Sequence, residues 1–536
     1  MKNTSLRRPL LTATSNEPNP AAERADFRAR LRERLFGRAY PLWVDGEGVL
    51  PAASLWFLIR ERLEIMRQSG LRSGDRIMLS LSSDRELLAW TLAALWEGCP
   101  AALAAPTAQP DDARQTAAYL SARALVQDLA AKPSLTLFPS AASDEQSTSS
   151  SSSLSSFSLS SSSLSSSFLT PSDAPALFLA TSGTSGKPRW IALSVRNIFS
   201  VVDSHLPALG LASPAFSSPD NEYPAARVLS LLPLQHAFGL VIDVFAALFA
   251  GAEIVRAAQG GRDTEEILRL AEAHTITHCS MTPLTASRLA GFEQGRDFLR
   301  GLTGGVVGGA PAREKLAQFL RETRLRVGYG QTEASPGITL GEPGVWLEGY
   351  LGEPLGCEIR LGDGGELEFR GDNACVGMWT DEGFLRFEPN RWVKTGDIAR
   401  RSEREEYTGF IYLGRVNDYF KLANGRWIPA PEWERILREE LREIADAALY
   451  PSADNERCDC VVVARAAEPH NESAGAFAAF LRSEIARILP LPPNYWGTLL
   501  LLSPEQWRAT PKGDADRRAL LAELRRYEAA MRFERL

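Results

Sequence analysis

The segment from Thr181 to Lys187 reads Thr-Ser-Gly-Thr-Ser-Gly-Lys and directly follows the apolar run Leu177–Ala180. Small residues let a backbone wrap closely around an anion, and the N–H groups, hydroxyls and lysine ammonium can donate to phosphate oxygens. It is not a Walker A loop, because that motif needs Gly at position 181 and Ser or Thr at 188, which here are Thr and Pro. We therefore expect a phosphate-binding loop of another kind; a loop without function is the alternative for this segment alone.

Three further segments have residue types that suit nucleotide chemistry. Val327–Glu333 places the Thr332 hydroxyl beside the Glu333 carboxylate after a tight glycine turn, which suits a magnesium and phosphate corner. Lys394–Asp397 presents a carboxylate that could hold ribose hydroxyls. Leu413–Asp418, which precedes a Gly-containing segment, is the third turn-like string. Each of these strings, taken alone, is equally consistent with a surface turn.

The order of these segments resembles that of the adenylate-forming superfamily of acyl- and aryl-CoA synthetases and related ligases. The matching segments, from about Leu55 to Leu520, are Thr181–Pro188, Pro233–His236, Gly308–Pro311, Tyr329–Glu333, Thr395–Asp397 and Gly414–Arg415. The resemblance implies activation of a carboxylic acid by ATP and Mg²⁺ to an acyl-adenylate. A thiol, from CoA or from the phosphopantetheine of an acyl carrier protein, would then take the acyl group.

The resemblance also implies roles for single residues around the phosphates. The β- and γ-phosphates would be cradled by Thr181, Ser182, Gly183, Thr184, Ser185, Gly186 and Lys187. Thr184 and Glu333 match positions that help hold magnesium, where metal and loop donors would neutralise charge on the leaving pyrophosphate. Thr332 would bind the α-phosphate.

The rest of the nucleotide would meet a second set of residues. By resemblance, adenine would contact Gly309, Ala310 and Pro311 and stack on Tyr329, which is followed by Gly330 and Gln331. Asp397 matches the ribose-binding carboxylate, and Arg415 also reaches the nucleotide. His236 matches the residue near the acyl carboxylate; taken alone, a histidine in an apolar run is more often a core residue. The apolar neighbours Ala237–Leu240 suggest a fatty or aromatic acid.

The C-terminal part matches the family with one reversal of charge. Asn417 falls at the family's hinge, and the thiol tunnel would be approached by Lys421, Gly425 and Arg426. The family's catalytic lysine aligns with Asp514, whose carboxylate would repel phosphates. Lys512 or Arg517 could supply the missing charge, adenylation could be weak, or the chain could perform mainly the thiol step. A nucleotide-binding pseudoenzyme and an acyl-carrier-protein ligase therefore stay open as alternatives.

Composition limits the partners. The 536 residues include 59 basic and 66 acidic side chains, giving a net charge of −7. This argues against nucleic-acid binding, which needs a concentrated positive field. Polar residues interrupt the apolar stretch Leu229–Val255, so no membrane span is expected, and the cytoplasm is the default location. Cys458 and Cys460 have no second ligand pair at metal spacing and are interpreted as ordinary strand thiols.

The elements that must position these residues alternate between helix and strand, which predicts an α/β fold. We expect a large N-terminal domain over residues 1–413, with α/β subdomains and a small β-rich subdomain between Gly352 and Gly409. A hinge at 414–418 and a small mobile α+β domain at 419–536 would follow. From 147 to 167, 16 of 21 residues are Ser, which predicts a disordered insert at 144–169. Helices are expected at 55–70, 86–98, 241–250, 432–443, 474–488 and from 516.

Overall fold

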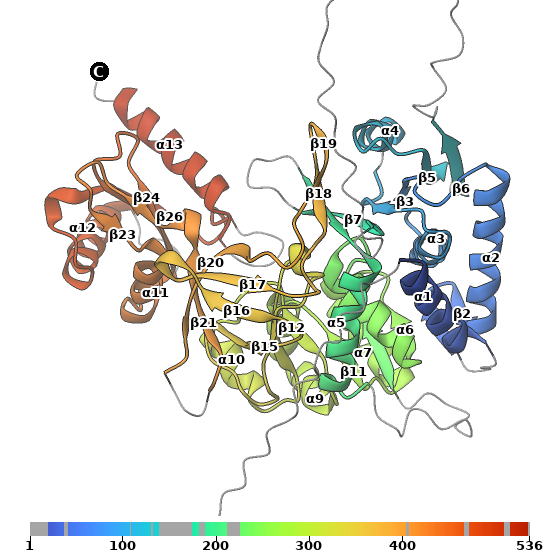
Figure 1. Ribbon diagram of the computed structural model, residues 1–536. Coiled ribbons are helices and arrows are strands. Elements are labelled where there is room, and N and C mark those ends of the chain that lie inside the picture. Colours follow the sequence, from blue (N-terminus) through green and yellow to red (C-terminus); the bar gives the residue numbers. More distant parts are fainter. Residues whose placement is uncertain are drawn as a thin grey trace, which may run out of the picture. The chain divides into compact units, whose positions relative to one another are not determined.

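The structure is a computed structural model and describes residues 20–36, 41–107, 109–129, 132–138, 174–181, 188–211, 226–403, 407–465, 471–508 and 515–533 (Figure 1). The chain divides into two compact units. Unit 1 comprises residues 1–38, 52–199 and 375–387, and unit 2 comprises residues 39–51, 200–374 and 388–536. The boundary falls within helix α5 (Val195–Ala208). The predicted Ser-rich insert at 144–169 lies outside the described residues.

Unit 1 is built on an eight-stranded sheet with the order β19-β18-β8-β7-β4-β3-β5-β6. The strands are β3 (Ile77–Ser80), β4 (Ala101–Leu103), β5 (Ala124–Leu129), β6 (Lys132–Leu137), β7 (Leu177–Thr181), β8 (Arg189–Leu193), β18 (Gly377–Thr380) and β19 (Gly383–Arg386). The central strands β7, β4, β3 and β5 are parallel. Parallel strands are covered on both faces, which accounts for the continuous apolar run Ile77–Leu79.

The helices of unit 1 are α1 (Pro20–Leu35), α2 (Ala52–Gln68), α3 (Asp84–Glu97) and α4 (Pro110–Tyr119). Helix α3 shows how local sequence sets the ends of an element. The Ser83 side chain accepts a hydrogen bond from the Glu86 N–H, and the helix stops at Gly98, whose φ of 83° is left-handed. Every residue from Leu87 to Trp96 is buried, so α3 is a core helix without a polar face.

The first part of unit 2 contains two sheets. The five-stranded sheet, in the order β11-β9-β10-β1-β2, is made of β1 (Pro41–Asp45), β2 (Gly48–Pro51), β9 (Arg227–Ser230), β10 (Glu253–Arg256) and β11 (His278–Ser280). The eight-stranded sheet follows the order β12-β13-β14-β15-β21-β20-β17-β16. Its strands are β12 (Val306–Gly308), β13 (Arg326–Tyr329), β14 (Thr339–Leu340), β15 (Tyr350–Pro354), β16 (Glu358–Leu361), β17 (Glu366–Arg370), β20 (Val393–Arg401) and β21 (Phe410–Arg415).

The two sheets of unit 2 are connected. Strands β9, β10 and β11 are parallel, β12 is parallel to β13, and parallel bridges from His278 to Gly304 and from Met281 to Val307 connect β11 with β12. The carboxyl ends of β9, β11, β12 and β13 therefore lie along one edge. The helices around these strands are the π-helix η3 (Phe238–Phe245), α6 (Ala246–Ala250), α7 (Thr264–His274), α8 (Pro283–Ala290), α9 (Glu293–Gly301) and α10 (Glu314–Leu320).

The C-terminal part of unit 2 is a smaller α+β assembly. A hairpin of β22 (Phe420–Lys421) and β23 (Trp427–Ile428) precedes α11 (Ala430–Glu440). The sheet β24-β25-β26 consists of β24 (Ile444–Pro451), β25 (Cys458–Ala464) and β26 (Trp496–Leu502), with helices α12 (Asn471–Ile488) and α13 (Arg517–Phe533). Cys458 and Cys460 are buried in β25, as the interpretation of ordinary strand thiols requires.

The predicted α/β class is confirmed, and the predicted helices are present with shifted ends. The helix predicted at 241–250 begins earlier, at Phe238, and its first part is a π-helix. The helix predicted at 432–443 ends at Glu440, because β24 starts at Ile444. The β-rich segment between Gly352 and Gly409 contributes strands to both eight-stranded sheets, since β18 and β19 pair in unit 1. Among the described residues, no helix is long and apolar enough to span a membrane.

Candidate active site

Three loops that carry predicted site residues leave the same edge of the parallel strands in unit 2. His236 lies in the loop after β9, Gly309–Pro311 follow β12, and Gly330–Glu333 follow β13. In α/β sheets, ligands bind in the crevice outside the carboxyl ends of parallel strands. The topology therefore brings together residues that are nearly 100 positions apart in the sequence.

Glycines let strands β12 and β13 approach each other closely at this edge. A Cβ at Gly308 would lie 2.5 Å from the Gly328 carbonyl oxygen, so β12 and β13 meet here without intervening side chains. Gly309 has a φ of 90°, and a Cβ built on it would meet open space. The backbone at Gly309 is exposed, and it can present its polar groups to a flat ligand such as a base.

The turn after β13 is folded tightly back on itself. The Ala334 N–H donates to the Gln331 carbonyl at 2.8 Å, and the Ile338 N–H donates to the Tyr329 carbonyl at 3.1 Å. A Cβ at Gly330 would lie 1.6 Å from the Pro336 carbonyl oxygen, so only glycine fits there. This packing leaves Thr332 and Glu333 half-buried in the 3₁₀ turn η5 (Thr332–Ala334).

Asn373 forms hydrogen bonds with the second half of this turn. Its Nδ2 donates to the Gly337 carbonyl at 2.7 Å, and its own carbonyl accepts a bond from the Ser335 hydroxyl at 2.9 Å. Asn373 is buried and follows β17, so it comes from a distant segment. The sequence does not reveal this role of Asn373, because a lone Asn after a Gly-Asp turn carries no signal of a long-range contact.

Tyr329, Asp397 and Arg415 form a contiguous polar cluster. The Tyr329 hydroxyl donates to Asp397 Oδ2 at 2.7 Å, and Arg415 Nε lies 2.9 Å from Asp397 Oδ1. The Asp397 N–H donates to the Thr395 hydroxyl oxygen at 3.1 Å, and the Thr395 hydroxyl donates to the Leu367 carbonyl at 2.8 Å. Asp397 sits on β20 and Arg415 on the paired strand β21, which sets them directly opposite each other.

Burial and charge act in opposite directions on this cluster. Burial raises the pKa of Asp397, whereas the Arg415 charge and the Tyr329 hydroxyl lower it, and the net pKa stays above the ordinary value. Burial also raises the pKa of Tyr329, and the Asp397 charge adds to this. Tyr329 is therefore a neutral hydrogen-bond donor, and Arg415 is the group that favours an ionised Asp397.

The loop before His236 is held by a buried arginine. His236 is exposed, while Arg256 is 8% exposed and its Nη1 donates to the carbonyls of Ser230 and Leu232 at 3.1 and 2.7 Å. A Cβ at Gly239 would lie 2.4 Å from the Pro233 carbonyl oxygen, so η3 packs directly on this loop. The sequence does not reveal this role of Arg256, because a single charged residue at the end of a strand is usually a surface residue.

The predicted hinge and thiol segment lie on the surface of unit 2. Asn417 is exposed in the 3₁₀ turn η7 (Val416–Asp418). Lys421, Gly425 and Arg426 are exposed on the β22–β23 hairpin, where Gly425 has a φ of 82° and its N–H donates to the Leu422 carbonyl at 2.8 Å. Trp427 on this hairpin is 52% exposed and stacks on Tyr419.

Two predicted sites fall partly outside the described residues. Thr181 ends β7 in unit 1 and its hydroxyl donates to the Arg189 carbonyl at 3.4 Å, but residues 182–187, including Thr184 and Lys187, lie outside the described part. Asp514 and Lys512 also lie outside it. Arg517 is described, and its guanidinium contacts Asp418, Glu434 and the Leu449 carbonyl.

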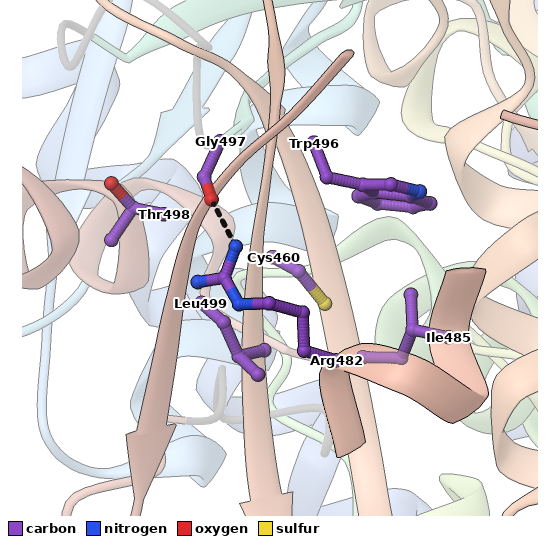
Figure 2. A pocket seen from close by; sticks show the side chains of 7 residues that line it. All are labelled: Cys460, Arg482, Ile485, Trp496, Gly497, Thr498 and Leu499. Atoms are coloured by element: carbon purple, nitrogen blue, oxygen red, sulfur yellow. Dashed lines mark hydrogen bonds between the residues drawn. The ribbon is translucent and has the colours of Figure 1, made fainter. Parts of the chain in front are cut away.

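A separate hollow lies in the C-terminal part. It is open to solvent, and the Arg482 guanidinium crosses it to donate to the Gly497 carbonyl at 3.1 Å (Figure 2). Its lining residues are Cys460, Arg482, Ile485, Trp496, Gly497, Thr498 and Leu499. They include no residue that the sequence analysis assigned to a site.

The donor set restricts how a metal could be held. Within the described residues, no group of three or more His, Cys, Asp or Glu side chains could form a protein metal cage. Magnesium usually keeps several waters and binds through one or two carboxylates together with substrate phosphates. Glu333, in the turn after β13, is a carboxylate of the kind such a site needs. Thr184, the other predicted magnesium residue, lies outside the described residues.

The chain is similar to known proteins in sequence and in fold. A family model described as AMP-binding enzyme matches residues 64–377. A 2-succinylbenzoate–CoA ligase of Bacillus pumilus is 30% identical over 279 residues, which are 49% of this chain and 53% of that ligase. ATP-bound MatB from Rhodopseudomonas palustris aligns with a TM-score of 0.68 at 18% identity, covering 92% of this chain and 98% of that chain. O-succinylbenzoate coenzyme A synthetase from Bacillus subtilis, with ATP and magnesium, gives 0.66 at 19% identity, covering 91% and 98%.

These matches differ in what they establish. The matched sequence spans about half the length of the first curated relatives. The solved structures establish the fold, that of a large domain followed by a small one. The family model covers more than half of the chain, and the chain therefore belongs to the family of AMP-binding enzymes.

Proposed function

We propose that this chain is an ATP-dependent carboxylic acid:thiol ligase that forms an acyl-adenylate and then an acyl thioester. The observation that carries the proposal is the Tyr329–Asp397–Arg415 cluster beside the loops after β12 and β13. It combines an aromatic ring, a carboxylate and a guanidinium, which suit a base, a ribose and a phosphate respectively. The CoA ligases among the relatives support the same reaction class.

In the first step, a carboxylate oxygen of the acid attacks the α-phosphorus of ATP, and pyrophosphate leaves. Asp397 accepts hydrogen bonds from the ribose hydroxyls, while Arg415 favours its ionised form. Thr332 donates to the α-phosphate, and His236 orients the acid from the loop that Arg256 holds. A magnesium ion held by Glu333 would neutralise charge on the leaving pyrophosphate.

In the second step, the thiol sulfur attacks the carbonyl carbon of the adenylate, AMP leaves, and the thiol proton is released. The β22–β23 hairpin, with Lys421, Gly425 and Arg426, guides the thiol. We propose CoA as the thiol donor, because exposed Trp427 and Lys421 offer an aromatic face and a cation close together, at 5.9 Å from ammonium to ring. A fatty or aromatic acid is the proposed substrate class.

Pyrophosphate exchange tests the first step. Purified protein with ATP, Mg²⁺ and a panel of fatty and aromatic acids should incorporate labelled pyrophosphate into ATP with at least one acid. Formation of a CoA thioester with the same acid tests the second step. Absence of exchange with every acid, together with absence of thioester, would contradict the proposal.

A second candidate, a nucleotide-binding pseudoenzyme, is favoured by two observations. By resemblance, Asp514 aligns with the family's lysine, and Arg517, a possible substitute for it, is held by Asp418 and Glu434. ATP binding without exchange would support this candidate. In that case, Asp514→Lys should create exchange activity, since it restores a positive charge beside the α-phosphate; Asp297→Lys, at a side chain that is 68% exposed, is the control.

A further inference from the structure

Ser335, which follows the turn carrying Thr332 and Glu333, has a strained backbone. It is fully buried and has a φ of 62°, in the left-handed region that residues other than glycine rarely adopt. Its N–H donates to the Thr332 carbonyl at 3.1 Å, so Ser335 lies directly against the 3₁₀ turn η5. Strain of this kind persists only where the surroundings hold it, and it gathers at functional sites.

Asn373 makes the hydrogen bonds that hold this conformation. The Ser335 hydroxyl donates to the Asn373 carbonyl at 2.9 Å, and Asn373 Nδ2 donates to the Gly337 carbonyl at 2.7 Å. Asn373 is 1% exposed, and hydrogen bonds in a buried environment are stronger than those in water. One buried residue therefore fixes the chain on either side of Pro336.

His205, in helix α5, packs against the same glycine that Asn373 binds. A Cβ at Gly337 would lie 2.4 Å from His205 Cε1, so the imidazole contacts the Gly337 backbone directly. Burial lowers the pKa of His205 to about 4, so the ring is neutral near pH 7, and its Nδ1 donates to the Val201 carbonyl at 2.9 Å. The ring is thus fixed to its own helix, and Gly337 cannot move toward it.

Asn373 belongs to the part of the sheet that also carries the proposed ribose ligand. It lies shortly after β17, in a turn that the Ala374 N–H closes by donating to the Gly371 carbonyl at 3.0 Å. Strand β17 pairs with β20, and β20 carries Asp397. The segment after β13 is therefore attached to this part of the sheet twice, by the Tyr329–Asp397 bond where it begins and by Asn373 where it ends.

We propose that Asn373 is a positioning residue that, through Ser335 and Gly337, sets Thr332 and Glu333 at a fixed distance from Asp397. In the proposed reaction, ATP meets Asp397 with its ribose and the other two residues with its phosphates and magnesium, so this distance must match the nucleotide. The catalytic consequence rests on the proposed ligase function, whereas the rigidity of the turn does not. Asn373 acts through the turn and touches no substrate itself.

Two variants each remove one of the bonds that Asn373 makes. Asn373→Ala removes the bond to Gly337 and leaves the backbone carbonyl that Ser335 binds. Ser335→Gly removes the hydroxyl, and glycine adopts a φ of 62° without strain, so this variant should fold even if Asn373→Ala does not. The control is Asn494→Ala, at an exposed asparagine in the 3₁₀ turn η8 (Pro493–Tyr495).

Hydrogen exchange of the full chain tests the positioning without relying on activity. In both variants we expect faster amide exchange at 332–338, where the N–H groups of Ala334, Ser335 and Ile338 close the turn. Exchange at 393–401, the strand that carries Asp397, should stay unchanged, and the control should alter neither segment. Unaltered exchange at 332–338, or faster exchange that extends over 393–401 as well, would overturn the proposal.

Adenosine binding and pyrophosphate exchange supply the second readout. Adenosine has the base and the ribose but no phosphate, so its dissociation constant should stay within about twofold in both variants. With ATP and an accepted acid, the kcat of exchange should fall by about tenfold or more, because small misplacements of catalytic groups cost this much. The magnesium concentration for half-maximal rate should rise.

Two outcomes of these measurements contradict the positioning role. Loss of adenosine binding together with exchange activity would show general damage to the nucleotide site, and an unchanged kcat would show that Asn373 does not set the position of the reacting groups. If the unmodified chain catalyses no exchange with any acid, the ligase function fails, while the hydrogen-exchange experiment still decides whether Asn373 holds the turn.

Discussion

The Tyr329 hydroxyl donates a hydrogen bond to Asp397 Oδ2 at 2.7 Å, across two strands of the eight-stranded sheet that are not neighbours. This bond fixes the plane of the tyrosine ring and the orientation of the carboxylate together. One contact thereby sets the two groups that we propose to bind the base and the ribose of ATP.

Tyr329→Phe should weaken ATP binding while it keeps the aromatic ring. The lost bond is internal to the protein, so its cost of about 1.5–3 kcal/mol falls on folding, and the thermal unfolding midpoint should drop by a few degrees. The KM for ATP should rise, because the Asp397 carboxylate is no longer held in the orientation that meets the ribose. Tyr527→Phe, on an exposed tyrosine of α13, is the control. An unchanged KM would contradict the proposed role of the pair.

Glu333→Gln should lower activity through magnesium and phosphate binding. The amide keeps the size of the side chain but loses the charge that a hard cation prefers. We expect a lower rate of pyrophosphate exchange and a higher magnesium concentration for half-maximal rate. Glu382→Gln, at the exposed turn between β18 and β19, should leave both unchanged. A Glu333→Gln enzyme with an unaltered rate would remove Glu333 from the site.

The sequence predicted the elements and the grouping of the loops, but not the residues that hold the loops in place. Alternating apolar runs and glycine stops are local signals, and they located α2, α3 and the strands β3 and β9. Motif order predicted that Tyr329 and Asp397 serve one ligand, and the structure brings them into contact. Asn373 and Arg256 were missed because their roles depend on contacts with backbone carbonyls from other segments, which leave no pattern in their own neighbourhood.

Asp243 should make stability depend on pH. Its carboxylate is 2% exposed in η3. Burial raises its pKa to about 7, although the Ser230 hydroxyl and the Arg256 charge lower it. Between the pKa of this carboxyl in the unfolded chain, about 4, and its pKa in the folded protein, the folded state binds more protons. Stability therefore falls as pH rises, by about 4 kcal/mol over this pH range.

Asp243→Asn should remove this pH dependence, because an amide does not titrate. The unfolding midpoint of the unmodified chain should fall between about pH 4 and pH 7 more steeply than that of the variant. Thermal unfolding in buffers of constant ionic strength measures the difference. Asp297→Asn, at a side chain that is 68% exposed, should follow the unmodified chain. Parallel curves for Asp243→Asn and the unmodified chain would show that Asp243 does not titrate in this range.

Gly330→Ala should damage the site more than the fold. The added Cβ would lie 1.6 Å from the Pro336 carbonyl oxygen, and the obstacle is backbone, so the turn carrying Thr332 and Glu333 must move. Misplacement of catalytic groups by about 1 Å costs about a hundredfold in rate, and we expect a loss of this size in pyrophosphate exchange. Gly301→Ala is the matched control, because its Cβ meets nothing within 4 Å and α9 ends there. If Gly330→Ala kept full activity, the tight turn after β13 would not be what positions these two side chains.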